Sequence, residues 1–196
     1  MGSFQFQRTK LSKNIEICNH FYIFVTEKLQ ETMKEHKIEI PVKVYTYEEL
    51  SLTDRTLVDK AKEMTYQSYA PYSHFSVGAA ALLDSGIVVT GSNQENAAYP
   101  SGICAERTTL FYAHAQYPNA AILALAIAAR NEAGEFVKSP CSPCGACRQV
   151  MLESQSRGGI PMRVLLYGTD CIYELACVED LLPLCFTAAD MGVCCI

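Results

Sequence analysis

The chain contains no tryptophan, no run of basic residues and no long apolar segment. Its 16 lysines and arginines are outnumbered by 21 aspartates and glutamates, and the formal net charge is -5. A protein that binds a polyphosphate strand needs a basic surface, so we do not expect nucleic acid as a partner. The apolar stretch over residues 15–25 is interrupted by Glu16, Asn19 and His20, which makes it too short and too polar to span a bilayer. No secretory signal is evident, and we expect a cytoplasmic protein without a membrane partner.

Cysteine, by contrast, is abundant, with ten thiols in 196 residues. Thiols stay reduced in a cytoplasm, so disulfides are not the expected use of these residues. Cys171, Cys177 and Cys185 have apolar neighbours in the sequence, which predicts that they fill space in the core. The remaining cysteines near residues 104 and 144 need another explanation.

The composition changes near residue 40. Residues 1–40 mix aromatic and aliphatic side chains with lysines and show no site chemistry, so we interpret them as an N-terminal extension of open role, with a peripheral helix over 24–37. The hydrophobic content of the whole chain, 49%, is enough for one sizeable core. We therefore predict an extension over 1–40 and one globular domain over 41–196.

Strands and helices alternate along this domain. A packing helix is predicted from Ser51 to near Tyr69, a second over 104–116, a third at the cysteine pair near residue 144, and a short one from Val178. The predicted strands fall at 76–83, 87–91, 120–129, 162–167 and 171–176. Strands interleaved with helices indicate an α/β sandwich.

A Cys-x-x-Cys motif stands at the start of the third helix, in Ser142-Pro-Cys-Gly-Ala-Cys-Arg-Gln149. Cys144 and Cys147 lie one turn apart on the same helix face, so both sulfurs can point at one metal ion. The motif alone also suits a redox dithiol, and zinc needs at least a third ligand, which Cys104 can supply. If Cys141 were a fourth ligand, the site would be closed and purely structural.

Three protein ligands leave the fourth tetrahedral position of zinc for water, whose pKa can fall to about 7 there. Cys104 and Cys144 each fall at a predicted helix N-terminus, where unpaired N–H groups favour thiolates. Glu106, two residues after Cys104, is the candidate proton carrier. Three thiolates overcompensate Zn²⁺, and Arg107 can offset this by donating hydrogen bonds to sulfur, a role that Arg148 can share.

These motifs resemble a known family. The segments that carry the resemblance are Ser73-His-Phe-Ser-Val-Gly-Ala-Ala80, Asn93-Gln-Glu-Asn-Ala97, Gly102-Ile-Cys-Ala-Glu-Arg-Thr108 and Ser142-Pro-Cys-Gly-Ala-Cys-Arg-Gln149. In order and spacing, over roughly residues 45–190, they are similar to the small homotetrameric zinc-dependent cytidine deaminases. Cysteine at position 104 matches the branch of that family that acts on free pyrimidine nucleosides.

The resemblance implies a three-layer α/β/α sandwich around a mixed five-stranded sheet, with 41–196 as the catalytic domain. It implies that Cys104, Cys144 and Cys147 bind zinc and that Glu106 relays protons while water replaces the amino group at C4 of cytidine or deoxycytidine. Pyrimidine salvage is the metabolic role that follows.

The resemblance also assigns the substrate pocket. Asn93 and Glu95 match residues that hold the ribose hydroxyls, Phe75 matches an aromatic packed against the pyrimidine, and Ala105 lines the same pocket. Phe186 matches a residue that reaches into a neighbouring subunit, which implies a homotetramer with shared sites.

Other interpretations of the same residues stay open from the sequence. Asn93 and Glu95 are also ordinary turn residues, and Phe75 and Phe186 are also ordinary core aromatics. A deaminase of another aminated heterocycle needs the same metal chemistry. The alternative outside the enzymes is an interaction domain that zinc holds together and that has no catalytic activity.

Overall fold

The computed structural model describes residues 34–192. Its contacts divide the chain into two compact units, Met1–Glu39 and Ile40–Ile196. In the first unit only residues 34–39 are described, and they form neither helix nor strand. The helix predicted over 24–37 therefore lies mostly outside the described residues, and its last four positions are not helical.

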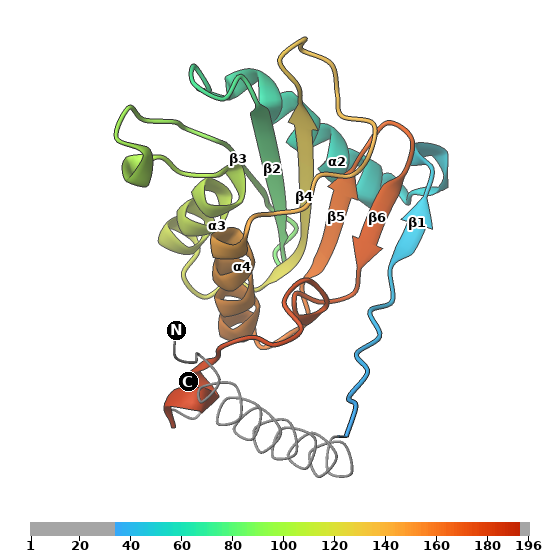
Figure 1. Ribbon diagram of the computed structural model, residues 1–196, viewed down its shortest axis with the longest axis vertical. Coiled ribbons are helices and arrows are strands. Elements are labelled where there is room, and N and C mark those ends of the chain that lie inside the picture. Colours follow the sequence, from blue (N-terminus) through green and yellow to red (C-terminus); the bar gives the residue numbers. More distant parts are fainter. Residues whose placement is uncertain (1–33, 193–196) are drawn as a thin grey trace, which may run out of the picture. The chain divides into compact units, whose positions relative to one another are not determined.

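The second unit is built on one mixed sheet (Figure 1). Its strands are β1 (Lys43–Tyr45), β2 (Ser76–Leu83), β3 (Val88–Ser92), β4 (Ile122–Arg130), β5 (Arg163–Tyr167) and β6 (Ile172–Leu175). They follow the order β1-β6-β5-β4-β2-β3. Strands β4 and β5 pair in parallel, and the other neighbours pair antiparallel. All five predicted strands are present.

The prediction of a five-stranded sheet is wrong by one strand. The sixth, β1, pairs with β6 at the edge of the sheet, with Lys43 opposite Glu174 and Tyr45 opposite Ile172. Only three residues long and without a buried side chain, β1 shows too little alternation of apolar and polar residues to be recognised from the sequence.

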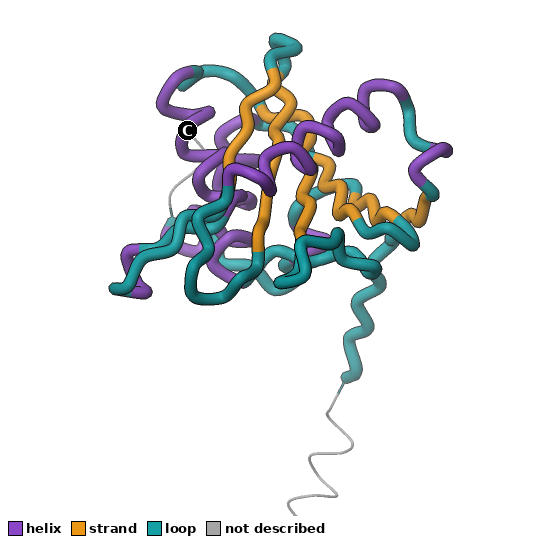
Figure 2. The backbone as a smooth tube through the Cα atoms, turned by 90° about the horizontal axis from the view of Figure 1, so that it is seen from above, coloured by secondary structure: helices purple, strands orange, loops and turns teal. Residues whose placement is uncertain are grey.

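Helices cover both faces of the sheet, as predicted for a three-layer sandwich. They are α2 (Leu52–Met64), α3 (Ala105–Gln116) and α4 (Gly145–Gly158). Helix α2 packs on one face, while α3 and α4 pack side by side on the other, so that Figure 2 shows helices on both sides of the strands. No helix within residues 34–192 combines the length and the apolarity that crossing a bilayer requires.

The ends of the helices follow local signals. The Ser51 hydroxyl accepts a hydrogen bond of 3.1 Å from the backbone N–H of Asp54 and so caps α2. After Met64 the chain continues as a 3-10 turn over Thr65–Gln67, close to the predicted end near Tyr69. The short helix predicted from Val178 is a 3-10 turn over Glu179–Leu181.

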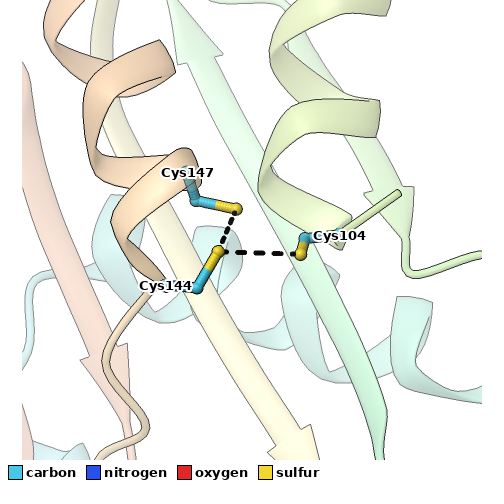
Figure 3. A group of neighbouring side chains, drawn as sticks. All are labelled: Cys104, Cys144 and Cys147. Carbon is cyan, nitrogen blue, oxygen red and sulfur yellow. Dashed lines mark hydrogen bonds between the residues drawn. The ribbon is translucent and has the colours of Figure 1, made fainter. Parts of the chain in front are cut away.

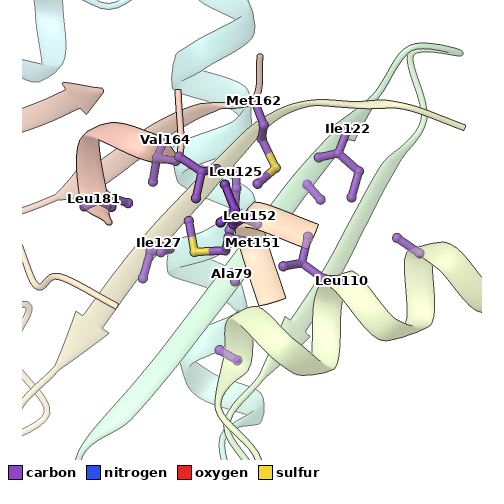
Figure 4. Close-up of a cluster of buried hydrophobic side chains, with 14 of the residues drawn as sticks. Ala79, Leu110, Ile122, Leu125, Ile127, Met151, Leu152, Met162, Val164 and Leu181 are labelled. Carbon is purple, nitrogen blue, oxygen red and sulfur yellow. The ribbon is translucent and has the colours of Figure 1, made fainter. Parts of the chain in front are cut away.

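Alternate residues of the central strands enter two separate cores. Leu125 and Ile127 of β4 point toward α3 and α4, where they meet Leu110, Met151 and Leu152 (Figure 4). In the core under α2, four of the seven buried residues that the sheet contributes are alanines: Ala80, Ala124, Ala126 and Ala128. Small side chains let the α2 helix lie close to the strands.

This topology brings two helix N-termini together. Strands β3 and β4 both run antiparallel to β2, so they point in the same direction and end at the same edge of the sheet. Helix α3 follows β3, and α4 follows β4. Because each helix begins where its strand ends, the residues that start α3 and α4 lie next to each other.

Candidate metal centre and active site

Three cysteines meet at these two helix N-termini. Cys104 is the N-cap of α3, Cys144 is the N-cap of α4, and Cys147 lies in the first turn of α4 (Figure 3). Sγ of Cys144 lies 3.9 Å from Sγ of Cys104 and 3.4 Å from Sγ of Cys147, and all three sulfurs lie within 4.8 Å of one another. In a tetrahedral zinc site with Zn–S of about 2.3 Å, neighbouring sulfurs are roughly 3.8 Å apart. The three thiols therefore fit one zinc ion.

Cys141 does not join this group among residues 34–192. Its thiol is half-buried and lies 3.9 Å from the carbonyl oxygen of Ser142. The cluster thus offers three protein ligands, as a catalytic zinc site does, rather than the four of a closed structural site.

The surroundings of the cluster favour thiolate. Hydrogen bonds from Cys147, Arg107 and Cys144 lower the pKa of Cys104 to about 5. Nη2 of Arg107 lies 3.8 Å from Sγ of Cys104, and this hydrogen bond raises the pKa of the guanidinium in return. The pKa of Cys147 is raised, because its proton is shared with Cys104 and its side chain is buried. A metal ion that displaces this proton gains a complete set of thiolates.

Glu106 lies in the first turn of α3 and is 4% exposed. Burial raises the pKa of its carboxyl group, and the negative charge of Cys104 raises it further. A raised pKa lets a carboxyl group hold a proton more readily, which suits a group that accepts and then donates one. Ala105, fully buried, holds the backbone between Cys104 and Glu106 in the core.

A pair of backbone hydrogen bonds places the loop after β3 beside the start of α3. Gln94 N–H donates to the carbonyl of Ile103, and Ile103 N–H donates to the carbonyl of Gln94, both at 2.9 Å. As a result Asn93 and Glu95 line one cavity of about 250 Å³ together with Cys104 and Arg107.

Asn93 is nearly buried and makes three hydrogen bonds with its side chain. Oδ1 accepts from Val77 N–H at 2.8 Å and from the Ser68 hydroxyl at 2.5 Å, while Nδ2 donates to the carbonyl of Phe75 at 2.9 Å. An asparagine amide has two N–H donors, so one remains for a ligand. The same amide also fixes the backbone of Phe75.

Glu95 is held by the loop that leads to Phe75. Oε2 accepts from the backbone N–H groups of Tyr72 at 2.9 Å and Ser73 at 3.2 Å. Hydrogen bonds from the Ser73 side chain and these N–H groups lower the pKa of Glu95, so it carries a negative charge. His74 then adopts a left-handed backbone conformation with φ 53°, which the sequence does not signal.

Seven of the predicted site residues do not line this cavity: Ala105, Glu106, Cys144 and Cys147, which lie around Cys104, and Phe75, Arg148 and Phe186. Phe75 is half-buried, and Phe186 is 57% exposed, with its carbonyl accepting a hydrogen bond of 2.9 Å from Gln149 Nε2. Arg148 donates to the carbonyls of Pro143 at 2.9 Å and Leu181 at 2.8 Å. These bonds hold the backbone ahead of Cys144. That Arg148 also donates a hydrogen bond to a cysteine sulfur stays a prediction.

Sequence reasoning left some cavity residues unassigned. Gln94, Asn96 and Tyr99 line the same cavity as Asn93 and Glu95. The signal for two of them was present, since Gln94 and Asn96 belong to the quoted Asn-Gln-Glu-Asn segment. The pairing of Gln94 with Ile103, which turns the loop toward the zinc ligands, has no sequence signature.

Three thiols that can hold zinc, beside a buried carboxyl group, are the arrangement expected of a zinc hydrolase. The family model described as "Cytidine and deoxycytidylate deaminase zinc-binding region" matches residues 51–160, more than half of the chain. The chain belongs to this family, and it is a zinc-dependent hydrolase of the cytidine deaminase type.

Similar proteins support this assignment. The cytidine deaminase of Halalkalibacterium halodurans is 40% identical over 136 residues, which cover 69% of this chain and 96% of that protein. The cytidine deaminase of Sporosarcina psychrophila is 39% identical over 136 residues, covering 69% of this chain and 93% of that protein. The crystal structure of cytidine deaminase from Burkholderia pseudomallei superposes with a TM-score of 0.56 at 38% identity, covering 67% of this chain and 97% of that chain.

Proposed function

We propose that this enzyme removes the amino group of cytidine and deoxycytidine by hydrolysis, giving uridine or deoxyuridine and ammonia, in pyrimidine salvage in the cytoplasm. One observation carries the proposal. The thiol cluster and the buried Glu106 lie next to a cavity whose lining includes both Asn93 and Glu95. Chemistry at the metal and recognition of a sugar then occur in adjoining places.

Zinc held by Cys104, Cys144 and Cys147 supplies a Lewis acid that makes water nucleophilic at neutral pH. Glu106 accepts a proton from the attacking water and delivers it to N3 of the pyrimidine, which makes C4 electrophilic. As the oxygen bonds to C4, Glu106 carries the second proton of the water to the amino nitrogen. The C4–N bond then breaks, ammonia leaves, and a carbonyl forms at C4. Such proton transfers typically contribute about 10² to 10⁴ in rate.

Recognition of the sugar falls to Asn93 and Glu95. The free N–H of the Asn93 amide can donate to one ribose hydroxyl, and the ionised Glu95 can accept from another. A carboxylate in the sugar subsite repels a nearby phosphate, which favours nucleosides over nucleotides. Phe75, whose backbone Asn93 fixes, packs against the pyrimidine. Ala105 is fully buried and does not line the cavity, so its contact with the substrate stays a prediction.

We also infer that the enzyme is a homotetramer with sites shared between subunits. The support is that Phe186, the aromatic expected to enclose substrate, is 57% exposed and does not line the cavity formed by residues of its own chain. An exposed aromatic residue late in the chain can instead close the pocket of a neighbour.

A panel of substrates tests the proposal. Loss of ultraviolet absorbance is measured with the zinc-loaded full chain on cytidine, deoxycytidine, cytosine and cytidine monophosphate. Both nucleosides should be turned over well, while cytosine and the nucleotide should be poor, because the sugar contacts position C4. Turnover of another aminated heterocycle but not of cytidine would contradict the substrate assignment, and a zinc-loaded but inactive protein would contradict the enzymatic function.

A further inference from the structure

The segment that leads to Cys144, residues 131–144, is held in place at several points by hydrogen bonds and side-chain packing. After β4 it turns at Asn131–Gly134 and comes back along the strand. Phe136 forms an isolated antiparallel bridge with Arg130, and Val137 N–H donates to the carbonyl of Ala129 at 3.1 Å. The first half of the segment is thus tied to the end of β4.

The turn between β5 and β6 holds the middle of the segment. Thr169 N–H donates to the carbonyl of Val137 at 3.0 Å, and Asp170 N–H donates to the carbonyl of Lys138 at 3.1 Å. Between these partners there is no room for a side chain at Gly168. A Cβ there would lie 2.4 Å from the carbonyl oxygen of Lys138 and 2.8 Å from the nitrogen of Pro140. Both clashes are with backbone, so any side chain at this position displaces the segment.

Side chains reinforce this contact. The ring of Phe136 packs edge to face on the ring of Tyr167, with centroids 5.6 Å apart and planes at 89°. Nζ of Lys62, from α2, lies 5.4 Å from the Phe136 centroid and 4.9 Å from that of Tyr167. Cation–π contacts of this kind add to the attraction between α2, β5 and the segment.

At its far end the segment is fixed to α4. Nε of Arg148 donates to the carbonyl of Pro143 at 2.9 Å, and the buried side chains of Met151 and Leu152 hold α4 in the core. Only residues 141 and 142 lie between the part fixed by the turn and the part fixed by Arg148. A shift at Lys138–Pro140 therefore reaches Cys144 with little chain to absorb it.

We propose that Gly168 is a positioning residue of the metal centre: it lets the β5–β6 turn seat against residues 138–140 and so sets where Cys144 meets Cys104 and Cys147. The inference rests on the proposed ligand set. It predicts that zinc is retained through a contact made by a residue that touches neither the metal ligands nor the substrate.

Zinc transfer from the full-length holoenzyme to an excess of a chromogenic chelator tests this inference. Gly168→Ala should release zinc about tenfold faster than the wild type, since residues that support metal ligands typically change metal affinity by about 10- to 100-fold. Gly78→Ala is the matched control, because a Cβ at Gly78 meets the carbonyl oxygen of Ala61 in α2, on the other face of the sheet. The control should lose stability to denaturant without faster release of zinc from the folded protein.

If Gly168→Ala does not fold, Phe136→Leu tests the same anchor, because it removes the ring contact with Tyr167 and leaves the backbone intact. Faster release from either variant, with wild-type release from Gly78→Ala, supports the positioning role. Wild-type release from the folded variants, or equal acceleration in Gly78→Ala, overturns it. Cys144→Ser keeps the two proposals apart: if it retained zinc like the wild type, the ligand assignment would fail, independently of Gly168.

Discussion

Arg107 lies one residue beyond Glu106, and its Nη2 is 3.8 Å from Sγ of Cys104. The contact joins a permanent positive charge to a proposed metal ligand, which is itself at the N-cap of the helix. Three thiolates on Zn²⁺ leave a net charge of about −1, which weakens the ion as a Lewis acid. We propose that donation from Arg107 withdraws charge from the sulfur and restores that acidity.

Arg107→Ala should therefore lower kcat/KM by about 10- to 100-fold while changing the free energy of unfolding little. Steady-state kinetics and urea denaturation of zinc-loaded protein measure the two effects separately. Arg107→Lys, which keeps the charge but not the planar donor group, should recover part of the activity. Full activity in the alanine variant would remove Arg107 from the metal site.

Glu106→Gln should retain zinc and fold but lose about 10²- to 10⁴-fold in kcat, because an amide cannot relay protons. The amide has nearly the same shape as the carboxyl group, so packing in this buried place is kept. Turnover is measured together with zinc content on the same sample. Near-normal turnover with full zinc content would show that another group carries the protons.

Cys144→Ala and Cys141→Ala form a second matched pair. Loss of a thiolate ligand should release zinc and destabilise the protein in the first variant. Cys141 stands outside the sulfur cluster, so its removal should leave zinc content unchanged. Metal analysis after gel filtration and thermal unfolding give both quantities. Equal zinc loss in the two variants would favour a closed structural site.

Phe186→Ala should raise KM about fivefold with little change in zinc content, since an aromatic face contributes about 1 kcal/mol beyond its buried area. The proposed shared site also requires an oligomer, which light scattering detects. A chain beginning at Met33 should keep this assembly if the extension is peripheral. A fully active monomer would contradict the shared site, and loss of the oligomer on truncation would place the extension in the interface.

The ion pair of Asp54 with Arg163 should make the free energy of unfolding fall at acid pH. Burial acts to raise its pKa, but hydrogen bonds from Arg163, at 2.8 Å, and Ser51 outweigh it and lower the pKa below its ordinary value of 3.8. The folded pKa is thus below the unfolded one, and the contribution to stability is present above about pH 4 and lost as pH falls through the folded pKa. Asp54→Asn should cost about 1–2 kcal/mol at neutral pH, and the difference should shrink toward zero as the pH falls below the folded pKa. Urea titrations across this range measure it, with the exposed Glu132→Gln as control; a constant difference at all pH values would contradict the ion pair.

How much of the site the sequence predicts depends on how local each signal is. The Cys144–Cys147 pair lies within one helical turn, and Cys104 is placed by a cap just before α3, so short-range rules suffice to select the proposed ligands. The helix N-termini meet because of strand direction, which the alternation of strands and helices already implies.

Features that depend on the assembled fold are what the sequence does not predict. The backbone pair of Gln94 with Ile103, the Arg148 bonds to Pro143 and Leu181, and the left-handed His74 all depend on the assembled fold. The edge strand β1 is similar, because its pairing with β6 spans about two thirds of the chain and its side chains show no pattern.

The positions of the proposed zinc ligands also affect the conformational entropy of the unfolded chain. Cys104 and Cys144 are 40 residues apart, and the whole of β4, the strand at the middle of the sheet, lies between them. A metal ion that joins these two sulfurs closes this part of the polypeptide into a loop that includes β4. A cross-link over a loop of this length restricts the unfolded chain by about 4 kcal/mol in the chain-entropy description. The zinc ion would thus also act as a reversible cross-link of the backbone, so a chelator should lower the free energy of unfolding of the whole domain.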